Sequence, residues 1–344
     1  MTRTIRLLVI FSLFCAPLKL QEHEPEQNFV QDSPVFSVGV ELVSVPVVAL
    51  NRRGRPLGEL TKDSFKVYEK RGENGTFIER EIDTFTHSDK LPLRAGVLID
   101  TSGSVQNPEQ FRYQKDVASE IVKLIFTPLM TRDRDNKVFV AEFSYESMAA
   151  NPTGGMFLIK QDWTNNPRTL IRAISRMKPL GLTPLFISIE QASGKFKEEV
   201  GEFATVLIVI SDGYNNLPFS SLSSSVSAAQ SAHLPVYTIG TTIPSRATWG
   251  WEMSEEPKKN LLEIAAGTGG RFFQLPSLKE VIEVASRILS DLDNRYYLEY
   301  KLNAEYEKGD NIEIKVEIGS YDKNNRWRST KAQLLHRSGY IVNK

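Results

Sequence analysis

The spacing of apolar residues changes twice along the chain, and each change predicts a different kind of structure. Residues 36–85 are rich in valine and partly alternate apolar with polar positions, which is typical of β-strands. The central part instead combines short, continuous apolar runs with segments in which an apolar residue recurs every three or four positions. That combination indicates a mostly parallel sheet covered by helices on both faces. From about residue 296 the strand pattern returns.

Five central runs are the predicted parallel strands: RAGVLID, KVFVAEFS, ATVLIVISD, LPVYTIG and GRFFQL. A further stretch, GGMFLIKQ, follows the second run closely enough to be its antiparallel partner at the edge of the sheet. Pro108 predicts the start of a helix, because proline is favoured at the first helical position, and Gly267 predicts the end of another. We therefore expect an α/β fold with a doubly wound, mostly parallel, Rossmann-like sheet.

The two strand-rich flanks bracket this α/β part, so we expect them to pack together as one β-rich domain into which the α/β domain is inserted. The expected divisions are a signal peptide at 1–20, a flexible leader at 21–35, an N-terminal β-rich segment at 36–90, the α/β domain at 91–295 and a C-terminal β-rich segment at 296–344.

The first twenty residues have the composition of a secretory signal peptide. Arg3 and Arg6 precede an apolar stretch at 7–14. Ala16 and Pro17 then lead to the polar segment QEHEPEQ at 21–27. The apolar stretch is too short to cross a bilayer, so we expect its removal and export to the periplasm, the cell envelope or the outside of the cell. A buried N-terminal strand or helix is the alternative interpretation.

Charge and cysteine content narrow the classes of function. The 344 residues have a formal net charge of zero, so nothing electrostatic favours nucleic acid or an anionic membrane as a partner. Removal of residues 1–20 takes away three basic residues and no acidic residue, which leaves 39 basic and 42 acidic residues and a net charge of −3. The single cysteine, Cys15, leaves with them, so neither a disulfide nor a thiol nucleophile is expected. No later segment is long and apolar enough to be a transmembrane helix.

Oxygen-bearing side chains follow several of the predicted strands. Asp100, Ser102 and Ser104 come at alternate positions after the first central run, and Asp212 follows the third run. Thr183 lies in the tight loop GLTPL, just before a predicted helix. Because the carboxyl ends of parallel strands meet at one edge of a doubly wound sheet, these side chains are expected to converge there.

Two carboxylates and three hydroxyls suit a hard cation that prefers oxygen ligands. Mg²⁺ is such a cation, and Mn²⁺ accepts similar ligands. Zinc is not expected, because the chain has only four scattered histidines and no cysteine after the signal segment. The sequence therefore predicts a magnesium or manganese site at the carboxyl edge of the sheet.

These motifs resemble those of a known family. The segment 100–104, DTSGS, is similar to the D-x-S-x-S motif of the metal-ion-dependent adhesion site of von Willebrand factor A domains. Thr183 in GLTPL and Asp212 in LIVISDG stand where that family has its distant threonine and its second aspartate. The flanks, VPVVALNRRGRPLGELTKDSFKVYE before the α/β part and HRSGYIV near the end, resemble a family of secreted bacterial VWFA-related proteins.

The resemblance implies a role for each residue of the site. Ser102, Ser104 and Thr183 would coordinate Mg²⁺ directly, and Asp100 and Asp212 would act largely through waters. An Asp or Glu carboxylate of a partner protein would then complete the coordination. On this basis we expect an exported, non-enzymatic protein-binding module.

Two other functions stay open. A Mg²⁺-dependent hydrolase or phosphotransferase would need a positioned base and a phosphate-binding loop or basic clamp, and none is found at these loop ends. Ser102 as a nucleophile would need a nearby histidine, but His233 precedes a different strand at the opposite edge. A structural module whose metal only stabilises the fold is the remaining alternative.

Two tryptophans mark a candidate partner contact. Trp249 and Trp251 lie in a long expected loop, 241–257, that follows the VYTIG strand and so emerges at the same edge as the site. They serve either as loop packing or as contacts for a partner. Long loops in compact domains are often functional, and aromatic residues are enriched at interfaces, so we hypothesise partner binding.

Overall fold

The computed structural model describes residues 42–103, 108–127, 134–146, 156–197, 203–241, 255–275 and 278–343. The expected signal peptide and leader, Ser104, Trp249 and Trp251 lie outside these residues, so the structure leaves them as predictions. None of the helices within the described ranges is long and apolar enough to span a membrane.

The centre of the fold is a six-stranded sheet in the order β10-β9-β8-β5-β6-β7. Its strands are β5 (Leu93–Asp100), β6 (Lys137–Phe143), β7 (Phe157–Thr164), β8 (Ala204–Ser211), β9 (Val236–Gly240) and β10 (Phe272–Gln274). Every neighbouring pair is parallel except β6 and β7, which are antiparallel. β5 and β8 are buried along their whole length, which is why their sequences are continuously apolar instead of alternating. The predicted fold class and the predicted edge strand are confirmed.

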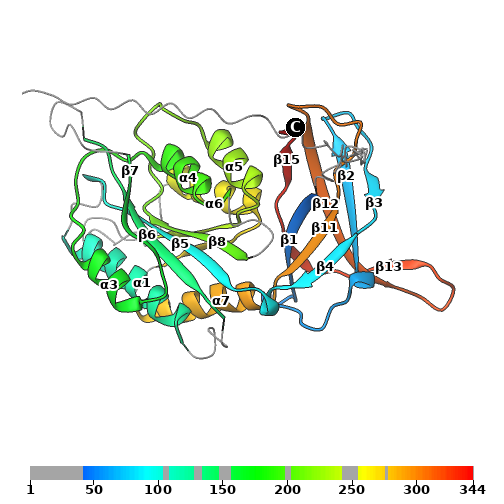
Figure 1. Cartoon of the computed structure of the whole chain (residues 1–344), viewed down its shortest axis with the longest axis horizontal. Helices are drawn as coiled ribbons and strands as arrows, with labels where there is room; N and C mark the ends of the chain where they lie inside the picture. The colour runs from blue at the N-terminus through cyan, green and yellow to red at the C-terminus, as the bar shows by residue number, and fades with distance from the viewer. Residues whose placement is uncertain are drawn as a thin grey trace, which may run out of the picture. The chain divides into compact units, whose positions relative to one another are not determined.

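Helices cover both faces of this sheet (Figure 1). One face packs against α1 (Pro108–Ile125), α3 (Pro167–Ser175) and α7 (Val281–Asp293), and the other against α4 (Leu185–Gly194), α5 (Leu222–Ser231) and α6 (Glu255–Thr268). Two separate apolar clusters result, one on each side of the sheet. The start of α1 at Pro108 is confirmed.

The predicted limits of α6 are wrong at both ends. The helix continues through Gly267 to Thr268, and the residue that stops it is Gly269, whose φ of +82° is left-handed. Its first residue is Glu255, so the segment 255–257 belongs to the helix and not to the loop. Pro257 is tolerated there because the first helical turn has no intrahelical partner for its amide nitrogen.

The two flanks form antiparallel sheets. Their strands are β1 (Leu42–Leu50), β2 (Phe65–Arg71), β3 (Ile78–Arg80), β4 (Thr84–His87), β11 (Tyr296–Lys301), β12 (Asn311–Tyr321), β13 (Trp327–Ser329), β14 (Gln333–Leu335) and β15 (Gly339–Ile341). The sheet orders are β14-β1-β11-β4 and β13-β12-β2-β3, with β15 paired to β12. Strands from the two ends of the chain alternate in the first sheet, and in the second sheet β12 from the C-terminal segment pairs with β2 from the N-terminal segment. The two sheets share one apolar cluster. Three short 3-10 turns, Lys62–Ser64, Ser88–Lys90 and Leu278–Glu280, complete the regular elements of the described residues.

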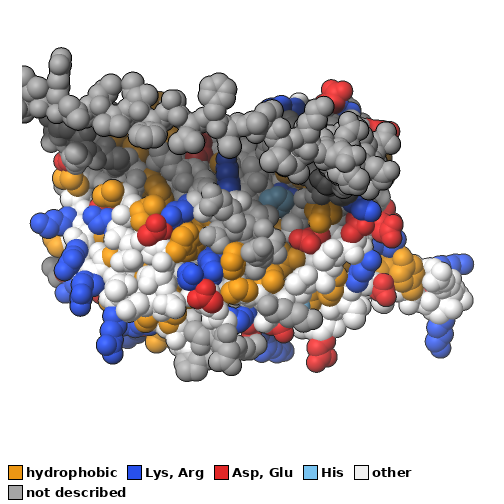
Figure 2. Space-filling view, in the orientation of Figure 1, with side chains coloured by type: hydrophobic (Ala, Val, Ile, Leu, Met, Phe, Trp, Pro, Cys, Tyr) orange, Lys and Arg blue, Asp and Glu red, His pale blue; other side chains and the backbone are white. Residues whose placement is uncertain are grey.

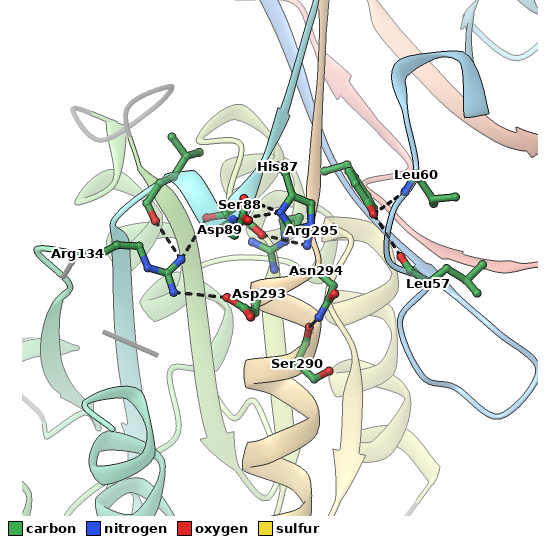
Figure 3. Close-up of polar contacts among 12 residues, drawn as sticks. Leu57, Leu60, His87, Ser88, Asp89, Arg134, Ser290, Asp293, Asn294 and Arg295 are labelled. Carbon is green, nitrogen blue, oxygen red and sulfur yellow. Dashed lines mark hydrogen bonds and ion pairs between the residues drawn. The ribbon is translucent and has the colours of Figure 1, made fainter. Parts of the chain in front are cut away.

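The chain enters and leaves the α/β part at neighbouring points, shown in Figure 3. The backbone nitrogen of Ser88 donates to Arg295 O at 2.8 Å, and the nitrogen of Arg295 donates to Ser88 Oγ at 3.0 Å. Arg134 donates from Nη1 to Ser88 O at 3.3 Å and lies 3.4 Å from the carboxylate of Asp293. The two crossing segments are therefore tied to each other and to the loop before β6.

A second set of contacts joins the ends of α5 and α6 to the β-rich sheets. Arg337 is buried and donates from Nη1 to Gln230 O, at the C-terminal end of α5, at 2.7 Å. A cation is stabilised there because unpaired carbonyl oxygens point out of a helix C-terminus. His233 lies just after α5, and its Nδ1 is 3.0 Å from Ser44 O on β1.

Acidic and basic side chains lie interspersed among apolar ones on the face shown in Figure 2. This mixture is what the balanced composition of 42 basic and 42 acidic residues implies.

Candidate metal site

The sheet brings the predicted site residues to one edge. β5 and β8 are neighbouring parallel strands in register, with Ile99 opposite Ile210, so Asp100 and Asp212 follow from adjacent strand ends. Asp100 and Ser102 are fully buried, and Asp212 is 4% exposed. Buried polar groups of this kind need hydrogen bonds or a counter-charge.

The carboxylate of Asp100 is held by three donors. Its Oδ1 accepts from the backbone nitrogen of Ser102 at 2.9 Å and from the hydroxyl of Ser102 at 2.5 Å. Its Oδ2 accepts from the hydroxyl of Ser211 at 2.6 Å. These bonds fix the carboxylate against the strand end and orient the Ser102 hydroxyl beside it.

A tight turn positions Thr183 next to this carboxylate loop. Gly181 has φ of +74°, and a Cβ there would lie 2.1 Å from the carbonyl oxygen of Tyr145, so only glycine fits. Leu182 and Tyr145 exchange two backbone hydrogen bonds of 2.8 and 2.9 Å. The backbone nitrogen of Gly103 donates to Gly181 O at 2.6 Å, which joins the DTSGS loop to the threonine loop.

The hydroxyl of Thr183 is the clearest sign that this polar network takes a ligand. Thr183 is fully buried, and its Oγ1 has no hydrogen-bond partner in the part of the chain that the structure describes. Its carbonyl oxygen accepts from the backbone nitrogen of Asn216 at 2.9 Å, so the backbone of the residue is held in place. Buried hydroxyls nearly always find a partner, and an exception requires an explanation.

The two carboxylates at the site also favour a bound cation. Burial and, to a smaller extent, the negative charge of Asp212 together raise the pKa of Asp100 from its usual 3.8 to about 7, although hydrogen bonds from Ser102 and Ser211 oppose the shift. The two carboxylates are therefore close enough to repel each other in a buried setting. A cation between them would remove that repulsion and lower the pKa of Asp100.

The residues present fit a hard divalent cation better than zinc. No group of three His, Cys, Asp or Glu side chains within the described ranges is arranged to hold a metal alone. A cation at this edge would need hydroxyl oxygens in addition to the two carboxylates, and Ser102 and the unpartnered Thr183 offer them. Such an oxygen set is typical of Mg²⁺ or Mn²⁺.

One residue of this site was missed in the sequence. Ser211 holds Oδ2 of Asp100 and accepts from the backbone nitrogen of Gly213 at 2.9 Å. The sequence feature that could have identified Ser211 is its position as the last residue of a buried strand, where valine or isoleucine would be expected. Ser104, Trp249 and Trp251 lie outside the described residues, so their predicted roles stay predictions.

Comparison with known proteins gives one family. The chain matches the von Willebrand factor type A domain over residues 96–287. Among solved structures, an aerotolerance-related membrane protein from Bacteroides fragilis is 15% identical, with 58% of this chain and 98% of that chain covered and a TM-score of 0.44. A von Willebrand factor type A protein from Catenulispora acidiphila is 12% identical, with 84% and 75% covered and a TM-score of 0.45. Proximal thread matrix protein 1 from the mussel byssus, solved with a zinc-occupied MIDAS motif, is 16% identical, with 64% and 50% covered and a TM-score of 0.45. A search of curated proteins found no match.

Proposed function

The chain belongs to the von Willebrand factor type A domain family, and from that premise we propose that it is an exported, non-enzymatic module that binds a partner protein through a divalent cation. The observation that carries the proposal is the pairing of two buried carboxylates, Asp100 and Asp212, with the buried hydroxyl of Thr183, which has no hydrogen-bond partner among the described residues. A polar, buried set with an excess of negative charge favours a cation over an organic substrate.

Each residue of the site has a distinct part in the proposal. Ser102 and Thr183 offer neutral hydroxyl oxygens to the cation, and Ser104 joins them on the strength of the sequence motif alone. Asp100 and Asp212 supply the negative charge that holds it. The hydrogen bonds from Ser211 and Ser102 restrain Asp100, so its carboxylate would act on a bound cation as a fixed negative charge.

This division leaves a role for the partner. Bound Mg²⁺ would supply an electrophilic centre with an open coordination position for an outside carboxylate. The chain's own part is to hold neutral oxygens around that position and to keep its two carboxylates fixed. The expected ligand is therefore an Asp or Glu side chain of another protein, and export by the N-terminal segment would bring the module to partners in the envelope or beyond.

A metal titration with matched variants tests the proposal. Calorimetry with Mg²⁺ and Mn²⁺ is expected to give binding for the wild type and none for the double variant Asp100→Asn, Asp212→Asn. Asp63→Asn is the control, because Asp63 is an exposed carboxylate in the turn before β2. Equal metal affinity in the double variant and the wild type would refute the site.

Partner binding is tested with the same proteins. Immobilised wild-type protein is incubated with envelope extract in Mg²⁺ or in EDTA, and the retained proteins are identified by mass spectrometry. We expect proteins that are retained only with Mg²⁺ and that the double variant does not retain. An identical retained set in all conditions, together with intact metal binding, would favour a metal that only stabilises the fold.

A further inference from the structure

Exposed apolar side chains gather on the two loops that hold the site. Leu180 and Leu182 lie on the loop that carries the unpartnered threonine and are 44% and 47% exposed. Tyr214 and Phe219 lie on the loop after β8 and are 43% and 49% exposed. These four side chains form an apolar rim. Single exposed apolar residues are ordinary on a surface, but a group of them beside a polar site marks an interaction surface.

Backbone and ring contacts join the rim into one surface. Leu182 exchanges two hydrogen bonds with Tyr145, and the Tyr145 ring meets the Phe219 ring edge-on at 5.7 Å between centroids. The backbone nitrogen of Asn216 donates to Thr183 O at 2.9 Å, which links the loop after β8 to the threonine loop. Tyr145 thus joins Leu182 to Phe219, and the backbones of the two loops are held together beside Thr183.

Few charges accompany the rim. Within 144–146, 178–184 and 212–220, the charged residues other than the site's own carboxylate are Glu146 and Lys178. The centre of a protein–protein interface has this composition, with aromatic residues enriched and charged residues depleted. A small free acid, or an acidic segment with only polar neighbours, would leave the apolar rim exposed to solvent.

We propose that the partner segment carries its Asp or Glu between bulky apolar side chains, and that the apolar rim selects it from other acidic segments. This inference rests on the proposed function, because the cation supplies the contact for the carboxylate. A cation attracts any accessible carboxylate, whereas burial of apolar neighbours against Leu182 and Phe219 depends on the residues beside it. The cation therefore requires an acidic residue in the partner segment, and the apolar rim selects the residues on either side of that acidic residue.

Three synthetic peptides of equal length test the inference. They contain Phe-Asp-Leu, Ser-Asp-Ser or Phe-Asn-Leu between glycines, and binding is followed by fluorescence polarisation in Mg²⁺ and in EDTA. We expect Phe-Asp-Leu to bind about tenfold more tightly than Ser-Asp-Ser in Mg²⁺, as a small interface with two apolar contacts gives. Phe-Asn-Leu is expected to bind no better in Mg²⁺ than in EDTA.

Variants assign the selectivity to the rim. The double variant Leu182→Ser, Phe219→Ser is expected to bind Phe-Asp-Leu as weakly as Ser-Asp-Ser, with unchanged affinity for Mg²⁺ by calorimetry. Ile282→Ser is the matched control, because Ile282 is 60% exposed on α7, away from these loops in the sequence.

The outcomes separate the two proposals. Equal, Mg²⁺-dependent binding of Phe-Asp-Leu and Ser-Asp-Ser would refute selection by the apolar rim, and it would agree with the proposed function. Loss of Mg²⁺ affinity in the Leu182→Ser, Phe219→Ser variant would also refute this selection, because the side chains of Leu182 and Phe219 would then support the metal site itself. No Mg²⁺-dependent binding of any peptide at millimolar concentration would overturn both.

Discussion

At the scale of single residues, Thr183 is the most informative position, because its buried hydroxyl has no hydrogen-bond partner among the described residues. An unsatisfied buried hydroxyl costs about 1–3 kcal/mol of folding stability, and Thr183→Val removes it with almost no change of shape. We expect the metal-free variant to be about 1 kcal/mol more stable than the wild type and to bind Mg²⁺ at least about tenfold more weakly. Urea denaturation in EDTA and calorimetric titration measure the two effects.

The matched control for this prediction is Thr238→Val on β9. Thr238 is equally buried, but its hydroxyl donates to Leu261 O at 2.9 Å, so its loss should destabilise the fold by about 1 kcal/mol and leave Mg²⁺ affinity unchanged. If Thr183→Val is also destabilising in EDTA, its hydroxyl has a structural partner. Unchanged Mg²⁺ affinity in that variant would remove Thr183 from the site.

At the scale of elements, the loop before α4 depends on one glycine. Gly181→Ala would place a methyl group 2.1 Å from Tyr145 O and force a non-glycine residue into φ of +74°. We expect a loss of at least about 2 kcal/mol in stability and a clear loss of Mg²⁺ affinity, because the loop carries Thr183. Thermal unfolding and metal titration measure both.

The control for the loop is the same substitution at the end of the next helix. Gly194→Ala, at the last residue of α4, meets no atom within 4 Å, so we expect unchanged or slightly higher stability and normal metal binding. Similar effects of the two substitutions would show that the turn at Gly181 has no special role in the site.

At the scale of the whole molecule, His233 reports on the contact between α5 and β1. Burial and, to a smaller extent, the positive charge of Arg337 together lower the pKa of His233 from 6.5 to about 3. Between those pH values the unfolded chain binds a proton that the folded protein does not, so stability falls as the pH falls below about 6.5.

His233→Asn tests this pH dependence, and asparagine tolerates the φ of +50° found at this position. Between pH 7.5 and 5.5 the wild type should lose about 1 kcal/mol more stability than the variant, measured by urea denaturation at each pH. Parallel pH profiles of the two proteins would mean that His233 has the same pKa in the folded and unfolded states.

Part of this structure could be predicted from local patterns alone. The continuous apolar runs around Val97 and Ile208 predict buried parallel strands because both faces of such a strand need apolar side chains. The motif at 100–104, with Thr183 and Asp212, marks the candidate site because strand ends in a doubly wound sheet meet at one edge. These inferences need only the periodicity of the chain and the order of its elements.

Other features depend on atoms that are distant in the sequence. The role of Ser211 follows from its distance to Asp100, 111 positions earlier, and the exact end of α6 follows from the backbone conformation of Gly269. The apolar rim exists because Leu182 and Phe219 are both joined to Tyr145, which no local pattern reveals. The sequence by itself therefore determined the elements and the residue types at the sheet edge, since these depend on neighbours along the chain. Only the tertiary structure decided which side chains hold Asp100, which hydroxyl has no partner among the described residues and which apolar residues lie beside the site, because those are contacts between separate loops.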